Sequence, residues 1–536
     1  MCLDPSPSFA LQRRMRKHPT TSWKDFDVMR CVSLETVSVG LIVGRVAAAS
    51  MEAKAALVSL AAAAALVESQ SRERGLTAGA TCVPSALAAV YGAVHGGTRR
   101  NAAWRAFAAS ATAAATGLGS SFFSSSSRSG AVVGFATWLA LTKEDPFFFE
   151  EKRSLLLRGA LAVGTQVTAS RLARCATGRS PRRAGEALGV ASILAVLADA
   201  TFFLPSPLSD APAVGVVWIG LLAVVATVFL ASARSGHSGG GGGDNNKREE
   251  GRLFLFLATL GCGLVGWVAC RLVVGVDPFA WLLRDLLGRR RKRVLAAWFA
   301  SLAAGLPLVL LARPAVGRVA ARKLFHVLAV CLFAPVALED PTLLQVAYGV
   351  ALGLLVWLEA ARNVAGKTSL VRRTLTDFYA PFLDDHEKEG VALAHIYLLF
   401  GCAAPHWLAS LLANFQKDGW TDGGGLLKNN PPQVRVLRLA GVAVLGLGDA
   451  SAAVVGQAIG TRHWPRSRRT LEGSLAFFLA VALPPGLCAP SGTYWASLAA
   501  SAGLLACFEA TTSQNDNLFL PLFAFALAAS AGRSSS

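Results

Sequence analysis

The chain has 536 residues, of which 53% are hydrophobic and only 16% are charged, and its formal net charge is +19. A soluble domain of ordinary composition carries about 25% charged residues, so this composition excludes that class. The positive charge does not indicate a nucleic-acid partner, because basic residues cluster in short segments between apolar runs, as in GRRRKR at 288–293. Such clusters are typical of the cytoplasmic loops of membrane proteins.

Apolar stretches long enough to cross a bilayer recur along most of the chain. Two examples are VGVVWIGLLAVVATVFLA at 214–231 and LFLFLATLGCGLVGWVACRLVVGV at 253–276. A crossing helix needs about 20 mainly apolar residues, and about 12 to 15 segments meet that requirement. We therefore predict an all-α fold, a polytopic transmembrane bundle with roughly 12–15 membrane-spanning helices. The ten cysteines show no metal-ligand spacing, so we predict neither a disulfide framework nor a zinc site.

The chain divides into four regions by composition. We expect a polar N-terminal extension at 1–50, a variable transmembrane helical region at 51–234, a polar loop at 235–251 and a second transmembrane region at 252–536. The loop reads SGHSGGGGGDNNKREEG, and a glycine-rich polar tract of this kind is typical of a flexible connection.

Polar residues become more specific after about residue 313. Lys323 and His326 lie one turn apart at the entry of an apolar run, and Glu359 lies near the end of the next. Glu509 and Asp516 flank the junction between the last two apolar segments. Acids inside a membrane segment mark a substrate path, an ion path or an ion pair. A lysine that extends to the interface and an interfacial histidine would give the same pattern at 323 and 326.

The order of the apolar segments predicts which loops share a side of the membrane. We expect crossings at 325–338, 342–360, 391–413, 434–456, 473–490 and 494–512. This alternation places Lys323 and the segments 361–390, 461–470 and 514–517 on one side, which is the more basic and therefore the cytoplasmic side. The cluster at 288–293 falls on the opposite side if 294–312 crosses fully, so either that segment is re-entrant or the count is off by one.

The stretch GDASAAVVGQAIGTRHWPRSRRTLEG at 448–473 carries the strongest functional signal. Asp449, Ala452, Gly456 and Gly460 share one helical face, and a face of small residues lets another backbone or a ligand approach closely. A carboxylate inside the membrane costs about 2.5–3.5 kcal/mol. Asp449 is therefore a candidate functional residue, and a structural ion pair with an arginine is the alternative.

The loop that follows combines groups suited to a triphosphate. Guanidinium groups bind phosphate oxygens bidentately, and Mg²⁺ prefers carboxylates together with phosphate oxygens. The arginines are Arg462, Arg466, Arg468 and Arg469, and the carboxylates on the same predicted side are Asp449, Glu472 and Asp516. The combination predicts a nucleotide site at the membrane surface. It is not a P-loop, because the chain has no G-x-x-x-x-G-K-[ST] motif.

The pattern D-x-x-A-x-x-x-G-x-x-x-G, followed by a basic pair, Thr, any residue and Glu-Gly, resembles the CTP-dependent lipid kinases. Within that family, FLDDHEKEGVALAHIYLLFGCAAPHWL at 382–408, the 448–473 stretch and FEATTSQNDNLFLPL at 508–522 are most similar to the dolichol kinase branch. The resemblance covers about 320–525. The basic pair here is Arg468-Arg469, where the family more usually has two lysines.

The resemblance implies a catalytic role for the region 252–536, with a CTP-binding loop at 457–472. The nucleotide-binding residues it implies are Gly456, Gln457, Gly460, Arg462, Arg466, Arg468, Arg469, Thr470 and Glu472. We take Asp449, Asp516 and Lys323 as catalytic candidates, and Asp449 and Glu472 as ligands of a divalent cation, Mg²⁺ or Ca²⁺.

The implied reaction transfers the γ-phosphoryl group of CTP to the hydroxyl of dolichol or a related polyprenol, giving dolichyl phosphate and CDP. The product is the lipid carrier for protein glycosylation. The implied location is the endoplasmic reticulum membrane, with the CTP loop facing the cytoplasm. Two alternatives remain: an enzyme like the phosphatidate cytidylyltransferases or another CTP-dependent lipid kinase, and, from a different class, a polytopic membrane transporter. A transporter of paired halves would show a second copy of the 448–473 pattern, and the chain has none.

Overall fold

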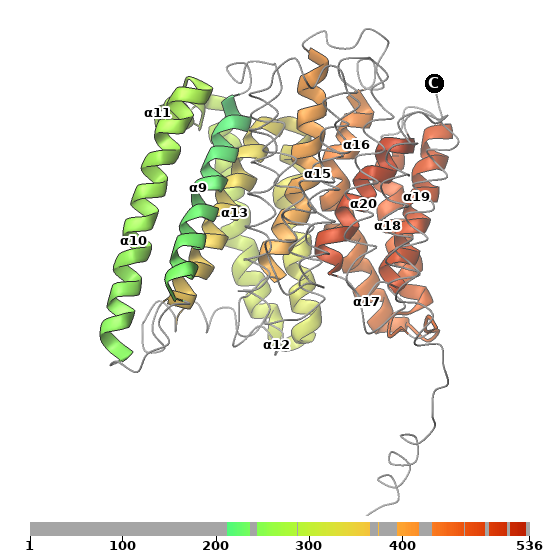
Figure 1. Ribbon diagram of the computed structural model, residues 1–536. Helices are drawn as coiled ribbons and strands as arrows, with labels where there is room; N and C mark the ends of the chain where they lie inside the picture. The colour runs from blue at the N-terminus through green and yellow to red at the C-terminus, as the bar shows by residue number, and fades with distance from the viewer. Residues whose placement is uncertain are drawn as a thin grey trace, which may run out of the picture.

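The computed structural model of the protein is a bundle of long helices (Figure 1). It describes residues 212–235, 244–286, 288–364, 374, 394–417, 431–465, 467–487, 492–511 and 515–531. In chain order the principal elements, with η for a π-helix, are α9 (Pro212–Ser235), α10 (Asp244–Ala269), η3 (Cys270–Val274), α11 (Pro278–Leu286), α12 (Arg289–Glu339), α13 (Pro341–Val364), α15 (Ala394–Lys417), α16 (Pro431–Val442), η4 (Ala443–Asp449), α17 (Ala450–Ile459), α18 (Leu471–Leu487), α19 (Gly492–Thr511) and α20 (Asp516–Ala531).

Three sequence predictions fall wholly or largely outside this description. The N-terminal extension at 1–50, most of the helical region at 51–234 and the side chain of Arg466 lie outside the described residues. The polar loop expected at 235–251 is described only in part. From Asp244 onward it is already the start of helix α10, because its lysine, arginine and glutamates are good helix formers.

The all-α prediction is confirmed, since every principal element within the described ranges is a helix and the only β-pairing there is one isolated bridge. Four helical stretches among the described residues are long and apolar enough to cross a bilayer: Leu253–Val274, Arg291–Ala312, Pro341–Arg362 and Gln433–Ile459. The chain is therefore a polytopic membrane protein. The total of roughly 12–15 crossings includes segments outside the described ranges and stays a prediction.

Helix α12 is folded back on itself. The indole nitrogen of Trp298 donates to the Leu332 carbonyl at 2.6 Å, although a straight helix would separate residues 34 apart by about 50 Å. A Cβ on Gly305 would lie 2.6 Å from the Leu328 side chain. Both contacts are centred close to Pro314 and Gly317, and a proline inside a helix is a common cause of a sharp bend. The two halves of α12 are thus antiparallel.

This hairpin settles the position of the basic cluster at 288–293. Arg291 pairs with Asp340, with its Nε 2.7 Å from the Asp340 Oδ2, so both ends of α12 lie at the same end of the bundle. The stretch 294–312 crosses as a segment of its own, and the cluster lies at the end opposite Lys323. A re-entrant segment is not needed. Because basic residues occupy both ends, charge alone does not identify the cytoplasmic end.

The helices divide into a buried core and a lipid-facing flank. Within the crossing windows of α13 and of α16–α17, 50% and 61% of residues are buried, against 11% in α10 and 6% in the first half of α12. Large apolar side chains such as Leu264, Phe299 and Leu311 are exposed on the flank. Apolar surface of this extent on a membrane protein faces lipid. The candidate residues Asp449 and Glu509, in contrast, are buried among the core helices.

Glycines let the core helices approach closely around the site. A Cβ on Gly401 of α15 would collide with the Asn517 carbonyl of α20, and one on Gly441 of α16 would collide with the Gly401 carbonyl. Backbones at this separation leave no room for a side chain. The contacts tie α15 and α16 to the start of α20, where Asp516 lies.

We expect Gly401→Ala to destabilise the protein by about 1–3 kcal/mol, because a backbone carbonyl must move to admit the methyl group. The measurement is the thermal unfolding midpoint of the purified chain in detergent, followed by tryptophan fluorescence. Gly503→Ala in α19 is the matched control, since nothing lies within 4 Å of its added Cβ. An equal midpoint for the two variants would contradict the close packing of α15 against α20.

Candidate active site

A π-helix positions Asp449 in the core. Helices α16 and α17 are joined without a break by η4, and Asp449 is its last residue, only 2% exposed. Gly446, within η4, lies directly against Val330 and close to the His326 carbonyl of α12. π-helical turns are rare and are frequently found at functional sites. This one brings Asp449 against the second half of α12.

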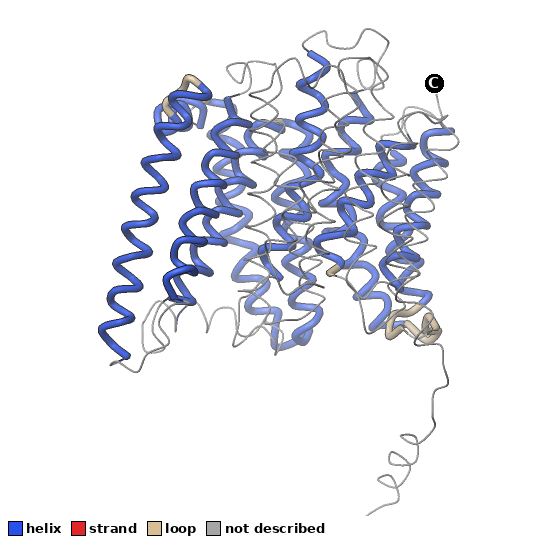
Figure 2. The backbone as a smooth tube through the Cα atoms, in the orientation of Figure 1, coloured by secondary structure: helices blue, strands red, loops and turns tan. Residues whose placement is uncertain are grey.

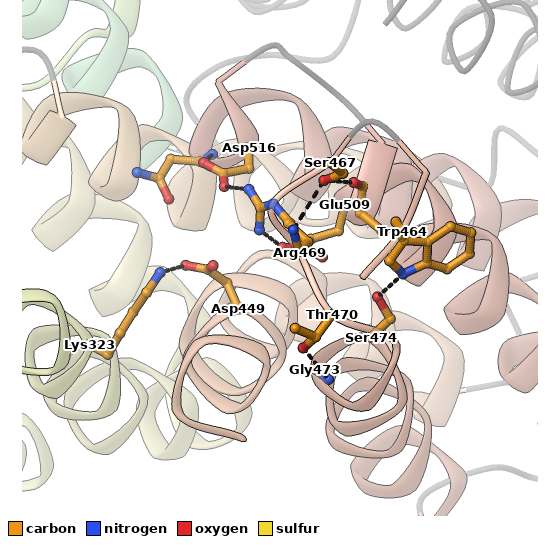
Figure 3. Close-up of polar contacts among 12 residues, drawn as sticks. Lys323, Asp449, Trp464, Ser467, Arg469, Thr470, Gly473, Ser474, Glu509 and Asp516 are labelled. Carbon is orange, nitrogen blue, oxygen red and sulfur yellow. Dashed lines mark hydrogen bonds and ion pairs between the residues drawn. The ribbon is translucent and has the colours of Figure 1, made fainter. Parts of the chain in front are cut away.

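Two side chains of α12 contact the Asp449 carboxylate. Lys323 forms an ion pair with its Oδ2 through the ammonium group, as Figure 3 shows. The His326 Nδ1 lies 3.3 Å from the same oxygen and donates a hydrogen bond to the Leu445 carbonyl of η4 at 2.8 Å. Lys323 and His326 are therefore partners of Asp449, and neither is only an interfacial residue.

The loop between α17 and α18 is drawn in tan at the lower right of Figure 2. Hydrogen bonds join its two ends, residues 461–462 and 471–472, and we call these joined ends the neck of the loop. The Leu471 amide donates to the Arg462 carbonyl at 2.8 Å, and the Trp464 amide donates to the Arg469 carbonyl at 3.0 Å. The Glu472 carboxylate accepts hydrogen bonds from the Thr461 hydroxyl at 2.8 Å and from the Arg462 amide at 3.2 Å. These contacts define a short, ordered hairpin.

Side-chain hydrogen bonds fasten the same loop to the helices beneath it. The Trp464 indole donates to the Ser474 hydroxyl of α18 at 2.9 Å, and the Ser467 hydroxyl donates to the Ala510 carbonyl of α19 at 2.8 Å. The Arg469 amide donates in turn to the Ser467 oxygen at 3.2 Å. The backbone at Arg469 is thereby positioned over the end of α19.

Arg469 reaches from this loop to two carboxylates on other helices. Its guanidinium forms an ion pair with Glu509 of α19 and lies 2.9 Å from the Asp516 Oδ2 of α20. Glu509 is only 1% exposed. In Figure 3, Arg469 extends toward Asp516 and Glu509, with Asp449 nearby.

Three carboxylates from three helical elements, η4, α19 and α20, converge beside Arg469. One oxygen each of Asp449, Glu509 and Asp516 lie within 4.8 Å of one another. Oxygens on opposite sides of an octahedral Mg²⁺ are about 4.2 Å apart, so small side-chain movements would bring these three onto one ion. The donor set is all oxygen and therefore fits Mg²⁺ or Ca²⁺.

The small-residue face of α17 packs against the chain's own backbone. A Cβ on Gly460 would lie 2.6 Å from the Thr470 side chain, and one on Gly473 would lie 2.8 Å from the Ala452 carbonyl. A Cβ on Gly456 would lie 3.0 Å from the Thr470 hydroxyl. The expected close approach of a second backbone therefore occurs, and it is made by the start of α18.

The structure brings together only some of the residues expected to bind the nucleotide. Gln457, Arg462 and Arg468 are exposed at the loop, and Arg469 is half-buried. Thr470 is buried and accepts a hydrogen bond from the Gly473 amide at 3.1 Å. It therefore stabilises the base of the loop.

The carboxylates that the structure groups together also differ from the pair expected to bind a cation. Glu472 is not a member of the carboxylate group, because its oxygens accept hydrogen bonds at the loop neck. The central residue that sequence reasoning left unassigned is Glu509, an acid inside an apolar segment. Glu359 carried the same signal, yet it pairs with Arg362 of its own helix at 2.6 Å.

Comparison with known proteins identifies relatives of one kind. The chain is 31% identical over 212 residues to the dolichol kinase sec59 of Schizosaccharomyces pombe. The match covers 38% of this chain and 38% of the relative. It is 30% identical over 286 residues to the dolichol kinase of Mus musculus, and this match covers 50% of this chain and 51% of the relative. Its identity to the dolichol kinase EVAN of Arabidopsis thaliana is 30% over 222 residues, or 40% and 35% of the two chains.

The matched regions thus span between about a third and about half of the length of these curated relatives. No protein-family model matches the chain. No solved structure matches it. The relatives come from a fungus, a mammal and a plant, all carry the same name, and none of them favours a transporter or a cytidylyltransferase. Over the matched regions, the chain is similar to dolichol kinases.

Proposed function

We propose that this protein transfers the γ-phosphoryl group of CTP to the terminal hydroxyl of dolichol, giving dolichyl phosphate and CDP. The observation that carries the proposal is the convergence of Asp449, Glu509 and Asp516 with Lys323 and Arg469 beside an arginine-rich loop. Phosphoryl transfer needs positioned groups and charge neutralisation more than covalent chemistry. The names of the relatives support a lipid kinase of this kind.

The exposed arginines of the loop are the proposed contacts for the triphosphate. Arg462 and Arg468 point away from the packed base of the loop, as their exposure indicates, and Gln457 is exposed near the same neck. A guanidinium group can hold two phosphate oxygens at once. The neck contacts of Glu472 would keep these arginines in place without contacting the nucleotide themselves.

Asp449, Glu509 and Asp516 are the residues proposed to hold a divalent cation. When bound, such an ion would neutralise the negative charge that builds up on the phosphate oxygens. Lys323 pairs with the Asp449 carboxylate and orients it. Asp449 or Asp516 would accept the proton of the dolichol hydroxyl as its oxygen forms the new bond to phosphorus and CDP leaves.

The acceptor would reach this site from within the membrane. Glu509 and Asp516 lie near the adjoining ends of α19 and α20, where a polar head group and an apolar tail can be held together. Grooves between helices rich in Ala, Gly and Leu would hold the isoprenoid chain, whose burial is favoured like that of any apolar surface. The proposed product is the lipid carrier for protein glycosylation.

The proposed location is the endoplasmic reticulum membrane, with the arginine loop facing the cytoplasm, where CTP is available. The four apolar crossing segments support a membrane location. The orientation rests on the chemistry of the loop, because the cluster at 288–293 places basic residues at the opposite end as well.

The test uses membranes that contain the full chain, dolichol and CTP labelled at the γ-phosphate. We expect label in the extracted lipid, competed by unlabelled CTP better than by ATP. CTP labelled in the α-phosphate is the parallel arm, since a cytidylyltransferase would place that label in lipid and release pyrophosphate. Absence of lipid label from both, with folded protein, would overturn the kinase proposal in favour of a transporter.

A further inference from the structure

Arg469 and a divalent cation would compete for the same carboxylates. The guanidinium pairs with Glu509 and lies 2.9 Å from the Asp516 Oδ2. The same two side chains, with Asp449, form the all-oxygen group that fits a cation. In the structure, the charge of Arg469 therefore neutralises oxygens that a bound ion would need.

Charge balance indicates that the two do not share the site. The count includes the carboxylates, the lysine and the arginine of the group. Three negative charges lie on Asp449, Glu509 and Asp516. Two positive charges lie on Lys323 and Arg469. Before any phosphate charge is counted, a divalent ion added to this set changes the net charge from −1 to +1, whereas the same ion without Arg469 gives neutrality. Unbalanced charge is costly in a buried environment, so entry of the ion favours departure of Arg469.

The side chain of Arg469 can leave while its loop stays folded. Its backbone is held by hydrogen bonds with Trp464 and Ser467, and the neck of the loop is closed by Glu472. The Arg469 side chain is 36% exposed, whereas that of Glu509 is 1% exposed. The arginine is therefore the more accessible member of the pair, and the carboxylate is the enclosed one.

We propose that Arg469 is an internal counter-ion of the cation site. It holds Glu509 and Asp516 when no nucleotide is bound, and it moves onto the triphosphate when a nucleotide arrives with a divalent cation. This inference deepens the proposed function and rests on it for the identity of the nucleotide. Binding of the cation and binding of the nucleotide are then coupled through one side chain, and the coupling acts equally in both directions.

The experiment measures Mn²⁺ binding to the purified full chain in detergent by electron paramagnetic resonance, without nucleotide. Arg469→Gln removes the counter-ion, and we expect it to bind Mn²⁺ about tenfold more tightly than the wild type. Arg468→Gln is the matched control, because it removes the same charge from the adjacent, exposed position. Its Mn²⁺ affinity is expected to equal that of the wild type.

Arg469→Lys provides a second variant if the glutamine variant does not fold. A single ammonium group does not reproduce the two-pronged contact with Glu509 and Asp516, so an affinity between wild type and Arg469→Gln is expected. Equal Mn²⁺ affinity in the wild type and in the folded Arg469 variants would overturn the proposal. An equal gain in Arg468→Gln would overturn it too, because the effect would then be one of general charge.

The transfer assay on the same preparations separates the two proposals. Label transfer by the wild type, with no change in Mn²⁺ affinity at Arg469, would refute the counter-ion and leave the kinase assignment intact. Tighter Mn²⁺ binding by Arg469→Gln, with no transfer by the wild type, would support the counter-ion and refute the kinase.

Discussion

Asp449→Asn is expected to lower phosphoryl transfer from CTP to dolichol by about 10³-fold or more, the range typical for loss of an acid–base group. Asparagine keeps the size of the side chain but lacks the charge that pairs with Lys323 and that could hold a cation or accept a proton. The measurement is the initial rate of label transfer at saturating CTP, so that a change in nucleotide affinity does not enter the result.

Folding must be checked for this variant, because Asp449 is buried and breaking a buried ion pair costs about 3–5 kcal/mol when one charge is left alone. The cost here is reduced, since the Lys323 side chain is 18% exposed and its ammonium can reach water. A monodisperse elution profile in detergent is the control. Near-normal transfer by folded Asp449→Asn would remove this acid from the catalytic group.

Glu509→Gln and Glu472→Gln form a matched pair of variants. They distinguish the carboxylate group proposed from the structure to bind a cation from the ligand pair expected from sequence. We expect Glu509→Gln to lower the rate by about 10²–10³-fold and to raise the divalent cation concentration needed for half-maximal rate. Glu509 belongs to the carboxylate group beside Asp449. A neutral amide is a much weaker ligand for Mg²⁺.

Glu472→Gln removes the same charge from the neck of the loop. Its carboxylate accepts hydrogen bonds from Thr461 and from the Arg462 amide, so its loss should loosen the loop and raise the KM for CTP by less than about tenfold. The cation requirement should not change. The measurement is a divalent-cation titration at fixed CTP for both variants. A shifted cation requirement in Glu472→Gln alone would show that the ligand pair expected from sequence is the correct one.

The sequence by itself determined the class of the protein and predicted where its chemistry lies. Hydropathy and helical period are local properties, so the all-α membrane fold and the crossing at 434–456 could be predicted from runs of residues. The importance of Asp449 followed from the cost of a carboxylate in an apolar segment. The arginines that follow it marked the loop as a site for an anionic ligand.

Only the tertiary structure decided which charged residues meet. Lys323 and Asp449 are 126 positions apart, and their contact depends on how α12 folds back and how η4 rotates Asp449 toward it. Glu359 and Glu509 carry the same sequence signal, an acid in an apolar helix, yet one pairs within its own helix and the other joins the group of three carboxylates. The physical reason is that the rotation and depth of each helix are set by packing against its neighbours, such as the close approach at Gly401 and Gly441, and no local pattern records them.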